Sequence, residues 1–227
     1  MRFVVIRHGQ SGNNLLWEQT GSEAGRHPDT PLTETGHQQA KLLAESIESL
    51  LPWHIDTIYT SLMARAVQTA APIAEALDLP LTGRTDLFEV GGPFDLDEDE
   101  QRIPHPGATA DELFELCDRL ALPPTASSRG WWTGPVENET DGPTNRARNL
   151  VADIRGRNDE DTTVALVSHG YFSQFLFREF LGIREMPGWV EIHNTSLTVY
   201  EDSPEFQSCR ALRVNWPPHL PDSLVTN

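Results

Sequence analysis

Two histidines with neighbours suited to phosphoryl chemistry each follow a run of apolar residues. One lies in Arg7-His8-Gly9 and the other in Ser168-His169-Gly170. A neutral imidazole is a nucleophile near pH 7 because its ordinary pKa is about 6.5. A guanidinium group can hold the oxygens of a phosphoryl group through parallel N–H bonds. The combination predicts a site at which a histidine attacks a bound phosphoryl group.

Arg65 adds a second guanidinium group to this candidate site. An expected strand at residues 55–59 is followed by Ser61, a favourable N-cap for a helix that carries Arg65 in its first turn. In open α/β sheets the ligand lies outside the carboxyl ends of the strands. We therefore expect the two histidines, 161 positions apart in sequence, to meet there. Two arginines and a helix N-terminus on that rim favour an anion, most simply a phosphoryl group.

The elements that must position these residues alternate between strand and helix. Short apolar runs predict strands at residues 2–6, 55–59, 79–82, 163–167, 196–200 and 210–214. Apolar residues spaced three and four apart, with their caps, predict helices that start after Thr33 and Ser61, and helices near 111–120, 145–155 and 172–181. This alternation predicts an α/β fold, a three-layer sandwich with a mostly parallel central sheet and helices on both faces.

Residues 83–143 depart from that pattern, because they are rich in proline, glycine and acidic residues. One helix is expected there, with Thr109 and Glu112 as a capping box. The segment has too few apolar residues for a core of its own. We therefore interpret residues 90–143, approximately, as an acidic lid inserted in a single domain that covers residues 1–227.

Four aromatic residues of this insertion allow two interpretations. Trp131, Trp132, Phe94 and Phe114 either wall a pocket for the part of the substrate that leaves, or the two tryptophans pin the insertion onto the α/β core. The proline-rich tail that follows the last strand is expected to be loose.

The motifs resemble those of the histidine phosphatase superfamily, the group that includes the cofactor-dependent phosphoglycerate mutases. The resemblance rests on Arg7-His8-Gly9-Gln10-Ser11, Pro31-Leu32-Thr33-Glu34-Thr35-Gly36, Arg65-Ala66-Val67-Gln68-Thr69, Leu87-Phe88-Glu89 and Ser168-His169-Gly170. These pieces occur in the family's order and span roughly residues 1–90 and 160–200. The resemblance implies a phosphoglycerate mutase-like fold and phosphoryl transfer without a metal or other cofactor.

The resemblance also implies a role for each matching residue. His8 is the nucleophile that forms a phosphohistidine, while Arg7 and Arg65 clamp the phosphoryl oxygens. His169 donates to the same oxygens, and Asn14 borders the phosphate or its ester. Attack by one ring nitrogen of His8 requires the other to be held as a donor, and we expect a backbone carbonyl in the turn at Gly9 to hold it.

The proton donor is less well defined by the motifs. The resemblance assigns this role to Glu89, which would later activate the water that hydrolyses the phosphohistidine. The family usually has an aromatic residue and a second glycine shortly after this acid, whereas here residues 90–94 read Val-Gly-Gly-Pro-Phe. Asp86 or another acid of the lid is therefore the alternative, and His105 is a further candidate to reach the site from the lid.

Composition excludes several other classes of function. Seventeen basic residues against 34 acidic ones give a net charge of −17, which argues against nucleic acid or an anionic membrane as partner. No apolar run approaches the roughly 20 residues of a membrane span, and the run at the N-terminus is too short for a signal peptide. We therefore expect a cytoplasmic protein. Cys117 and Cys209 are too few and too far apart for a disulfide scaffold.

Eleven acidic residues and one basic residue lie between Asp86 and Asp118. This surplus is either a solvated surface or a field that discourages highly charged substrates. No metal site is expected, because the remaining histidines lack the spacing of metal ligands; these are His27, His37, His54, His193 and His219.

We therefore expect a phosphatase that hydrolyses a small-molecule phosphomonoester through a phosphohistidine. The alternatives are a phosphoglycerate mutase-type phosphoryl transfer and a non-catalytic phospholigand-binding protein. A mutase must bind a second anionic group, usually with basic residues of the insertion. That segment offers Arg102, Arg119 and Arg129 among many acids, which favours hydrolysis. The sequence is also compatible with a homodimer, because edge strands in this architecture often pair.

Overall fold

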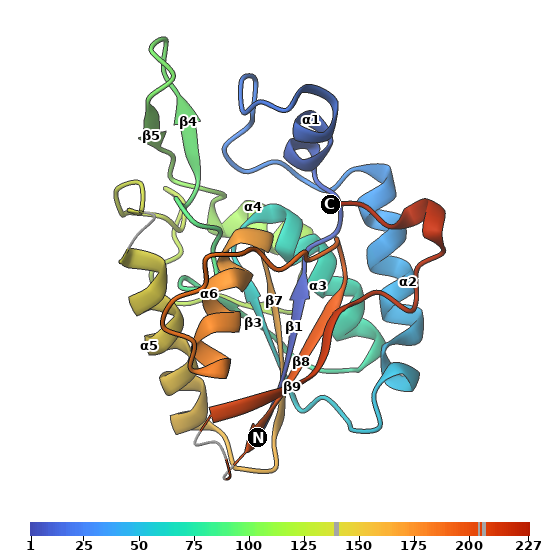
Figure 1. Ribbon diagram of the computed structural model, residues 1–227. Coiled ribbons are helices and arrows are strands. Elements are labelled where there is room, and N and C mark those ends of the chain that lie inside the picture. The colour runs from blue at the N-terminus through green and yellow to red at the C-terminus, as the bar shows by residue number, and fades with distance from the viewer. Residues whose placement is uncertain (139–140, 204, 206–207) are drawn as a thin grey trace.

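A computed structural model describes residues 1–138, 141–203, 205 and 208–227. Its centre is a seven-stranded sheet with the strand order β6-β3-β2-β7-β1-β8-β9 (Figure 1). The strands are β1 (Arg2–Arg7), β2 (Thr57–Ser61), β3 (Leu81–Arg84), β6 (Leu120–Ala121), β7 (Thr163–Ser168), β8 (Leu197–Ser203) and β9 (Ser208–Trp216). The first five in the spatial order pair in parallel, and β8 and β9 join as antiparallel strands.

Helices cover both faces of this sheet (Figure 1). They are α1 (Gly12–Thr20), α2 (Glu34–Leu50), α3 (Ala64–Ala76), α4 (Ala110–Leu116), α5 (Gly142–Arg157), α6 (Gly170–Leu181) and the 3-10 helix η1 (Asp222–Leu224). Side chains of β1 alternate between two cores, as expected for a strand buried on both faces. Val4 and Ile6 pack with residues of α2 and α3, whereas Phe3 and Val5 pack with residues of α5 and α6. The predicted three-layer α/β architecture is confirmed.

The pairing of β1 with β7 positions the candidate site. The register places Arg7 opposite Ser168, so the chain leaves both strands at the same level of the sheet. The next residue in each case is a histidine, and the two rings lie with centroids 5.1 Å apart. A parallel register set by two β-branched runs therefore brings His8 and His169 together.

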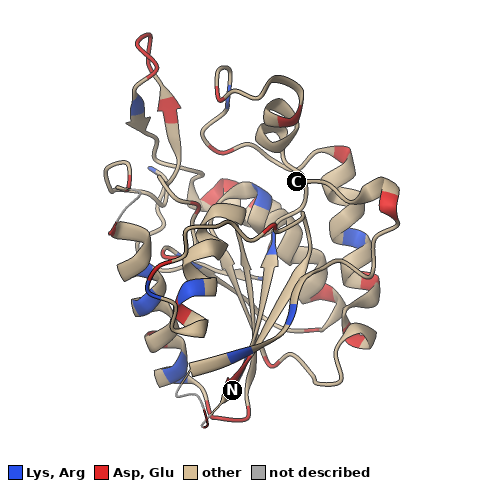
Figure 2. Cartoon of the chain, in the orientation of Figure 1, with Lys and Arg blue, Asp and Glu red and all other residues tan. Residues whose placement is uncertain are grey.

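The insertion is attached to the sheet at several points. Its strands β4 (Phe94–Leu96) and β5 (Arg102–Pro104) form a hairpin that projects from the body (Figure 1). The acids of the hairpin gather at its tip, as Figure 2 shows. Strand β6 pairs with β3 of the main sheet.

The two tryptophans of the insertion pack against the α/β core. Trp131 is 2% exposed, and its ring lies 5.6 Å from that of Trp132 and 6.3 Å from that of Phe88. They therefore pin the insertion, as one of the two interpretations proposed. Phe114 is 47% exposed and lies on α4, where it lines a groove with residues of α2 and α3.

The expectation of a loose C-terminal tail is wrong. The side-chain amide of Gln39 donates to the carbonyl of Leu224 at 2.7 Å and to the hydroxyl of Thr226 at 2.8 Å. Thr226 in turn donates to Asn194 Oδ1 at 2.9 Å. Composition alone indicates a loose proline-rich segment, but these long-range hydrogen bonds hold it against α2.

Two local predictions also need correction. Ser61 is not the N-cap of α3, because that helix begins after Met63; the Ser61 hydroxyl instead accepts from the Met63 amide at 3.2 Å. The expected helix near 111–120 ends at Leu116, since Cys117 has an extended backbone. The capping box of Thr109 and Glu112 is confirmed.

Two further observations concern the cysteines and the length of the helices. Cys117 and Cys209 are both free thiols. None of the helices in the described ranges is both long enough and apolar enough to cross a membrane.

Close backbone packing between Gly36 and the loop after β1 leads to a stability prediction. A methyl carbon at Gly36 would lie 2.1 Å from the carbonyl oxygen of Gln10, and backbone cannot move aside as a flexible side chain can. We expect Gly36→Ala to lower the free energy of unfolding by about 2 kcal/mol, measured by denaturant titration. Gly156→Ala is the control, because nothing lies within 4 Å of its added carbon and alanine favours a helix. Equal unfolding midpoints for Gly36→Ala and the unmodified chain would contradict this packing argument.

Candidate active site

His8 is held as a neutral imidazole with a defined tautomer. The residue follows β1 and is 3% exposed. Its Nδ1 lies 2.7 Å from the Gly9 carbonyl oxygen, which can only accept, so Nδ1 carries the proton. Its Nε2 accepts from Arg65 Nε at 3.1 Å. Burial, and then the charges of Arg65 and Arg7, hold the pKa of His8 well below 6.5. The expected carbonyl at the Gly9 turn is present, and the lone pair is on Nε2.

Arg65 comes from the first turn of α3 and is 5% exposed. Its Nη1 is buried and has no hydrogen-bond partner among the described residues. The helix is fixed at this end by Asp29, whose Oδ1 accepts from the Ala64 amide at 2.9 Å. Thr69 ties the same helix to the loop after β1, since its hydroxyl donates to the Arg65 carbonyl at 2.7 Å and accepts from the Gly9 amide at 2.9 Å.

Arg7 ends β1 with its guanidinium group turned toward the same region. Its Nη1 donates to the Ile192 carbonyl, and its buried Nε has no partner among the described residues. Burial lowers the pKa of Arg7 to about 10, so the group is still charged at pH 7. Gly170 permits this approach, because a methyl carbon there would lie 3.1 Å from Arg7 Nε.

His169 is the N-cap of α6 and is fully buried. Its Nε2 lies 2.8 Å from the Ser61 hydroxyl. That hydroxyl also accepts from the Met63 amide and still has one proton and one lone pair, so it can pair with either tautomer of His169. Nδ1 is buried without a partner among the described residues. Burial, followed by the charge of Arg65, holds the pKa of His169 well below 6.5.

Glu89 is fixed by three backbone N–H groups. Oε1 accepts from the amides of Val90 and Phe172, both at 2.8 Å, and Oε2 accepts from that of Tyr171 at 3.1 Å. Two of these donors belong to the first turn of α6. Glu89 and Arg7 line the same cavity. A carboxylate and a guanidinium group therefore line one cavity.

Arg146 supports the segment that carries Glu89 through contacts with Phe88 and Phe172. The sequence analysis did not identify it. Its guanidinium carbon lies 3.6 Å from the ring centroid of Phe88 and 3.7 Å from that of Phe172. Its Nη1 donates to the Phe88 carbonyl at 2.8 Å, while Nε and Nη2 bind Glu137 at 2.8 and 2.7 Å. These partners are far apart in sequence, so no local pattern identifies them.

The other acid considered for proton transfer is engaged elsewhere. Asp86 accepts from Arg84 Nε and Nη2, both at 2.8 Å. His105 stays at the base of the hairpin, where its Nδ1 accepts from the Gly107 amide at 3.1 Å. Neither side chain lines the two cavities beside His8 and Arg7.

Asn14 lies at the start of α1, a helix that the sequence analysis missed. Its Oδ1 accepts from the amide and the hydroxyl of Ser11 at 3.0 and 2.9 Å. Asn194 is a second residue that was missed; it is fully buried and donates to the His8 carbonyl at 2.9 Å. Both amides therefore support the loop that carries His8.

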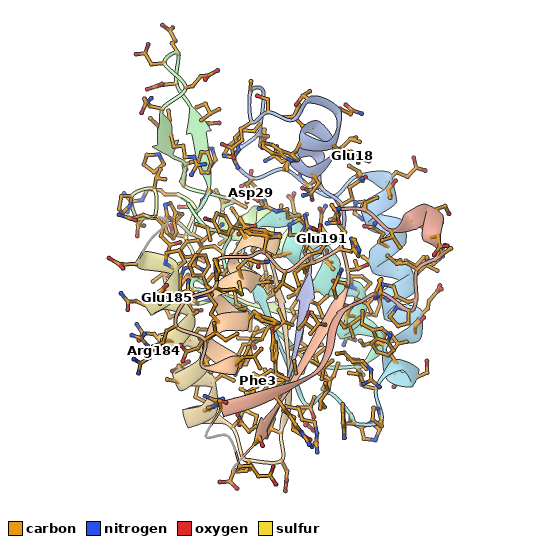
Figure 3. The ribbon with its side chains drawn as sticks, in the orientation of Figure 1. Phe3, Glu18, Asp29, Arg184, Glu185 and Glu191 are labelled. Carbon is orange, nitrogen blue, oxygen red and sulfur yellow. The ribbon has the colours of Figure 1, made fainter. Side chains whose placement is uncertain are left out.

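Two adjoining cavities open from these groups. One has a volume of about 190 Å³ and is lined by His8, Arg65 and Arg26, among others. The other has a volume of about 570 Å³. Arg7, Asn14 and Glu89 line both. Figure 3 shows Glu18, Asp29 and Glu191 around this end of the sheet. Across the described ranges, no group of three or more potential ligands could hold a metal ion.

Comparison with known proteins agrees with this geometry. The chain is similar to phosphoserine phosphatase 1 of Hydrogenobacter thermophilus, with 26% identity over 195 residues that cover 83% of this chain and 80% of that protein. A probable phosphatase of Schizosaccharomyces pombe is 45% identical over 75 residues, which are 33% of this chain and only 32% of that protein. Phosphoglycerate mutases are among the further relatives.

Solved structures share the fold. The mycobacterial glucosyl-3-phosphoglycerate phosphatase in complex with VO3 superimposes with a TM-score of 0.60 and 26% identity, over 95% of this chain and 99% of that one. The sequence model of the histidine phosphatase superfamily (branch 1) matches residues 3–215. A match over nearly the whole length, together with two buried histidines and two buried arginines at the carboxyl ends of parallel strands, leads to one conclusion: the chain belongs to branch 1 of the histidine phosphatase superfamily.

Proposed function

We propose that this protein is a metal-independent phosphatase that hydrolyses a small-molecule phosphomonoester through a phosphohistidine on His8. The observation that carries the proposal is a set of buried nitrogen atoms around that residue that have no hydrogen-bond partner among the described residues: Arg7 Nε, Arg65 Nη1 and His169 Nδ1. A buried donor without a partner costs roughly 1–3 kcal/mol. A phosphoryl group offers three acceptor oxygens and would satisfy donors from all three residues.

The proposed first step is an in-line displacement. His8 Nε2 attacks phosphorus, the P–O bond to the alcohol breaks, and the alcohol leaves with a proton. Arg65 Nε occupies the Nε2 lone pair in the free protein, so it must turn toward the phosphoryl oxygens before attack. Substrate binding thus frees the nucleophile and satisfies the arginine together.

In the proposed second step, water attacks the phosphohistidine. The N–P bond breaks, inorganic phosphate forms, and the proton that water loses passes to a base. Glu89 is the group best situated for both proton transfers, because it lines both cavities and its position is fixed by three N–H bonds. The pairing of Asp86 with Arg84 argues against the alternative acid.

The contacts of the insertion's arginines support hydrolysis over mutase chemistry. Arg102 pairs with Glu23, and Arg119 pairs with Asp78. Neither they nor Arg129 line the two cavities. The convergence of His8, both arginines and His169 likewise argues against a non-catalytic ligand-binding protein.

Removal of the nucleophile tests the proposal directly. We expect the native chain to release inorganic phosphate and to form an acid-labile, alkali-stable phosphoenzyme with a labelled phosphomonoester. His8→Ala should form none, and its turnover should fall by about a thousandfold or more. His37→Ala, an exposed histidine on α2, is the control. Label that persists in His8→Ala refutes the nucleophile, and formation of an isomer in place of phosphate favours the mutase.

The proton-transfer group is tested by Glu89→Gln. Gln retains an oxygen for the N–H groups of α6 but cannot exchange the proton, so we expect kcat to fall by about a hundredfold or more. Vanadate, which occupies the phosphoryl position, should still bind. Asp86→Asn is the matched control and should keep its rate. If Asp86→Asn loses turnover and Glu89→Gln does not, the role belongs to Asp86.

A further inference from the structure

The larger cavity next to the phosphate-binding groups is lined by aromatic rings and carboxylates. Trp17 on α1, Tyr171 on α6 and Trp189, in the segment before β8, contribute rings. Glu18 and Glu191 contribute the carboxylates beyond Glu89. We propose that this cavity receives the leaving alcohol and that the alcohol carries a positively charged amine. The inference rests on the proposed phosphatase function and names its substrate class.

The two tryptophans of this cavity expose more of their side chains to solvent than folding alone explains. Trp17 and Trp189 are each 58% exposed, the largest values among the exposed large hydrophobic residues in the described ranges. The ring of Tyr171 lies 5.2 Å from that of Trp189. Two exposed indole rings and a half-buried phenol ring around one cavity are suited to a cation, which is attracted to their faces.

The carboxylates give the cavity a negative charge. Glu191 precedes Ile192, whose carbonyl binds Arg7, so one carboxylate lies close to the phosphate clamp. Glu18 accepts a long hydrogen bond of 3.5 Å from Gln10 and no other from a described residue. Within the described ranges, neither Glu18 nor Glu191 forms an ion pair with an arginine or lysine. Figure 3 shows Glu18 on α1 above Glu191.

Among the residues that the structure describes, Arg7 is the only basic one that lines this cavity. Once a phosphoryl group takes up that charge, the carboxylates have no cation to balance them. Arg26 lines the smaller cavity instead, and its guanidinium group stacks on the Phe94 ring at 3.5 Å and donates to the Phe94 carbonyl. An ammonium group would be attracted to this space, whereas a carboxylate on the leaving group would be repelled. A neutral sugar could contact the rings but would leave the carboxylates unbalanced.

The experiment compares two esters of nearly equal shape. Phosphoethanolamine carries the amine, and 2-hydroxyethyl phosphate carries a hydroxyl in its place. Binding is measured calorimetrically with His8→Ala, which cannot consume the ester, and kcat/KM is measured with the native chain. We expect phosphoethanolamine to be favoured by about tenfold in both measurements. Phosphoserine, which adds a carboxylate, and glucose 6-phosphate, a neutral sugar ester, should bind more weakly than phosphoethanolamine.

Variants of the two cavity glutamates test whether the preference for phosphoethanolamine arises in this cavity. Glu191→Gln and Glu18→Gln should each lower the ratio of the two esters by about threefold, and the double variant should bring it close to one. Glu185→Gln is the matched control: it lies on the same connection between α6 and β8, is exposed, and does not line the cavity. Its ratio should not change.

The outcomes separate this inference from the proposed function. Equal affinity for the two esters, or tighter binding of the sugar ester, overturns the proposal that the alcohol carries an amine, and tighter binding of phosphoserine overturns the expected repulsion of a carboxylate. That result leaves the phosphatase standing if phosphate is still released. A tenfold binding preference without turnover of any ester upholds the cavity's specificity and refutes the phosphatase. A preference that survives in the double variant refutes the role of the two carboxylates.

Discussion

Arg7 and Arg65 bury their guanidinium groups at the carboxyl edge of the sheet, and neither forms an ion pair with a carboxylate among the described residues. Removing a charged group from water is costly unless another charge compensates it. Neighbouring side chains reduce the cost of burying these two charges. Asp29 and Glu89 lie near enough to favour the charged form of Arg65, yet both are fixed to backbone amides and leave the space beside His8 open. The nearby histidines stay neutral because burial and the two positive charges disfavour their protonation.

The net charge of the chain is −17, yet the guanidinium groups of Arg7 and Arg65 lie together at one edge of the sheet. The positive field is confined to the small region around these two groups, and several acids, among them Asp29, Glu89 and Glu191, lie near it. Those of the hairpin gather at its tip, as Figure 2 shows. The hairpin is held by its base, where the guanidinium carbons of Arg26 and Arg102 lie 3.5 and 4.6 Å from the ring centroid of Phe94. A local field of this kind sets which ligand enters the site, and net charge alone does not.

Much of the frame could be predicted from the sequence because the signals were local. The β-branched run before His8 and the one before His169 identify buried strands, and the motifs at their ends identify the site. What was missed depends on contacts between distant residues. Helix α1 buries none of its residues, so it has no apolar stripe to detect. Arg146 binds Glu137 and the Phe88 carbonyl, and Gln39 holds the tail at Leu224; neither partner can be inferred from neighbours in sequence.

The central claim is that His8 in the free protein is a neutral imidazole with its proton on Nδ1 and its lone pair on Nε2. Nitrogen-15 NMR of the imidazole measures this directly, with the His8 signals assigned by their loss in His8→Gln. The account predicts a protonated Nδ1 and an unprotonated Nε2 at pH 7, with a titration midpoint well below 6.5. A proton on Nε2, or an ordinary titration with a midpoint near 6.5, would contradict it.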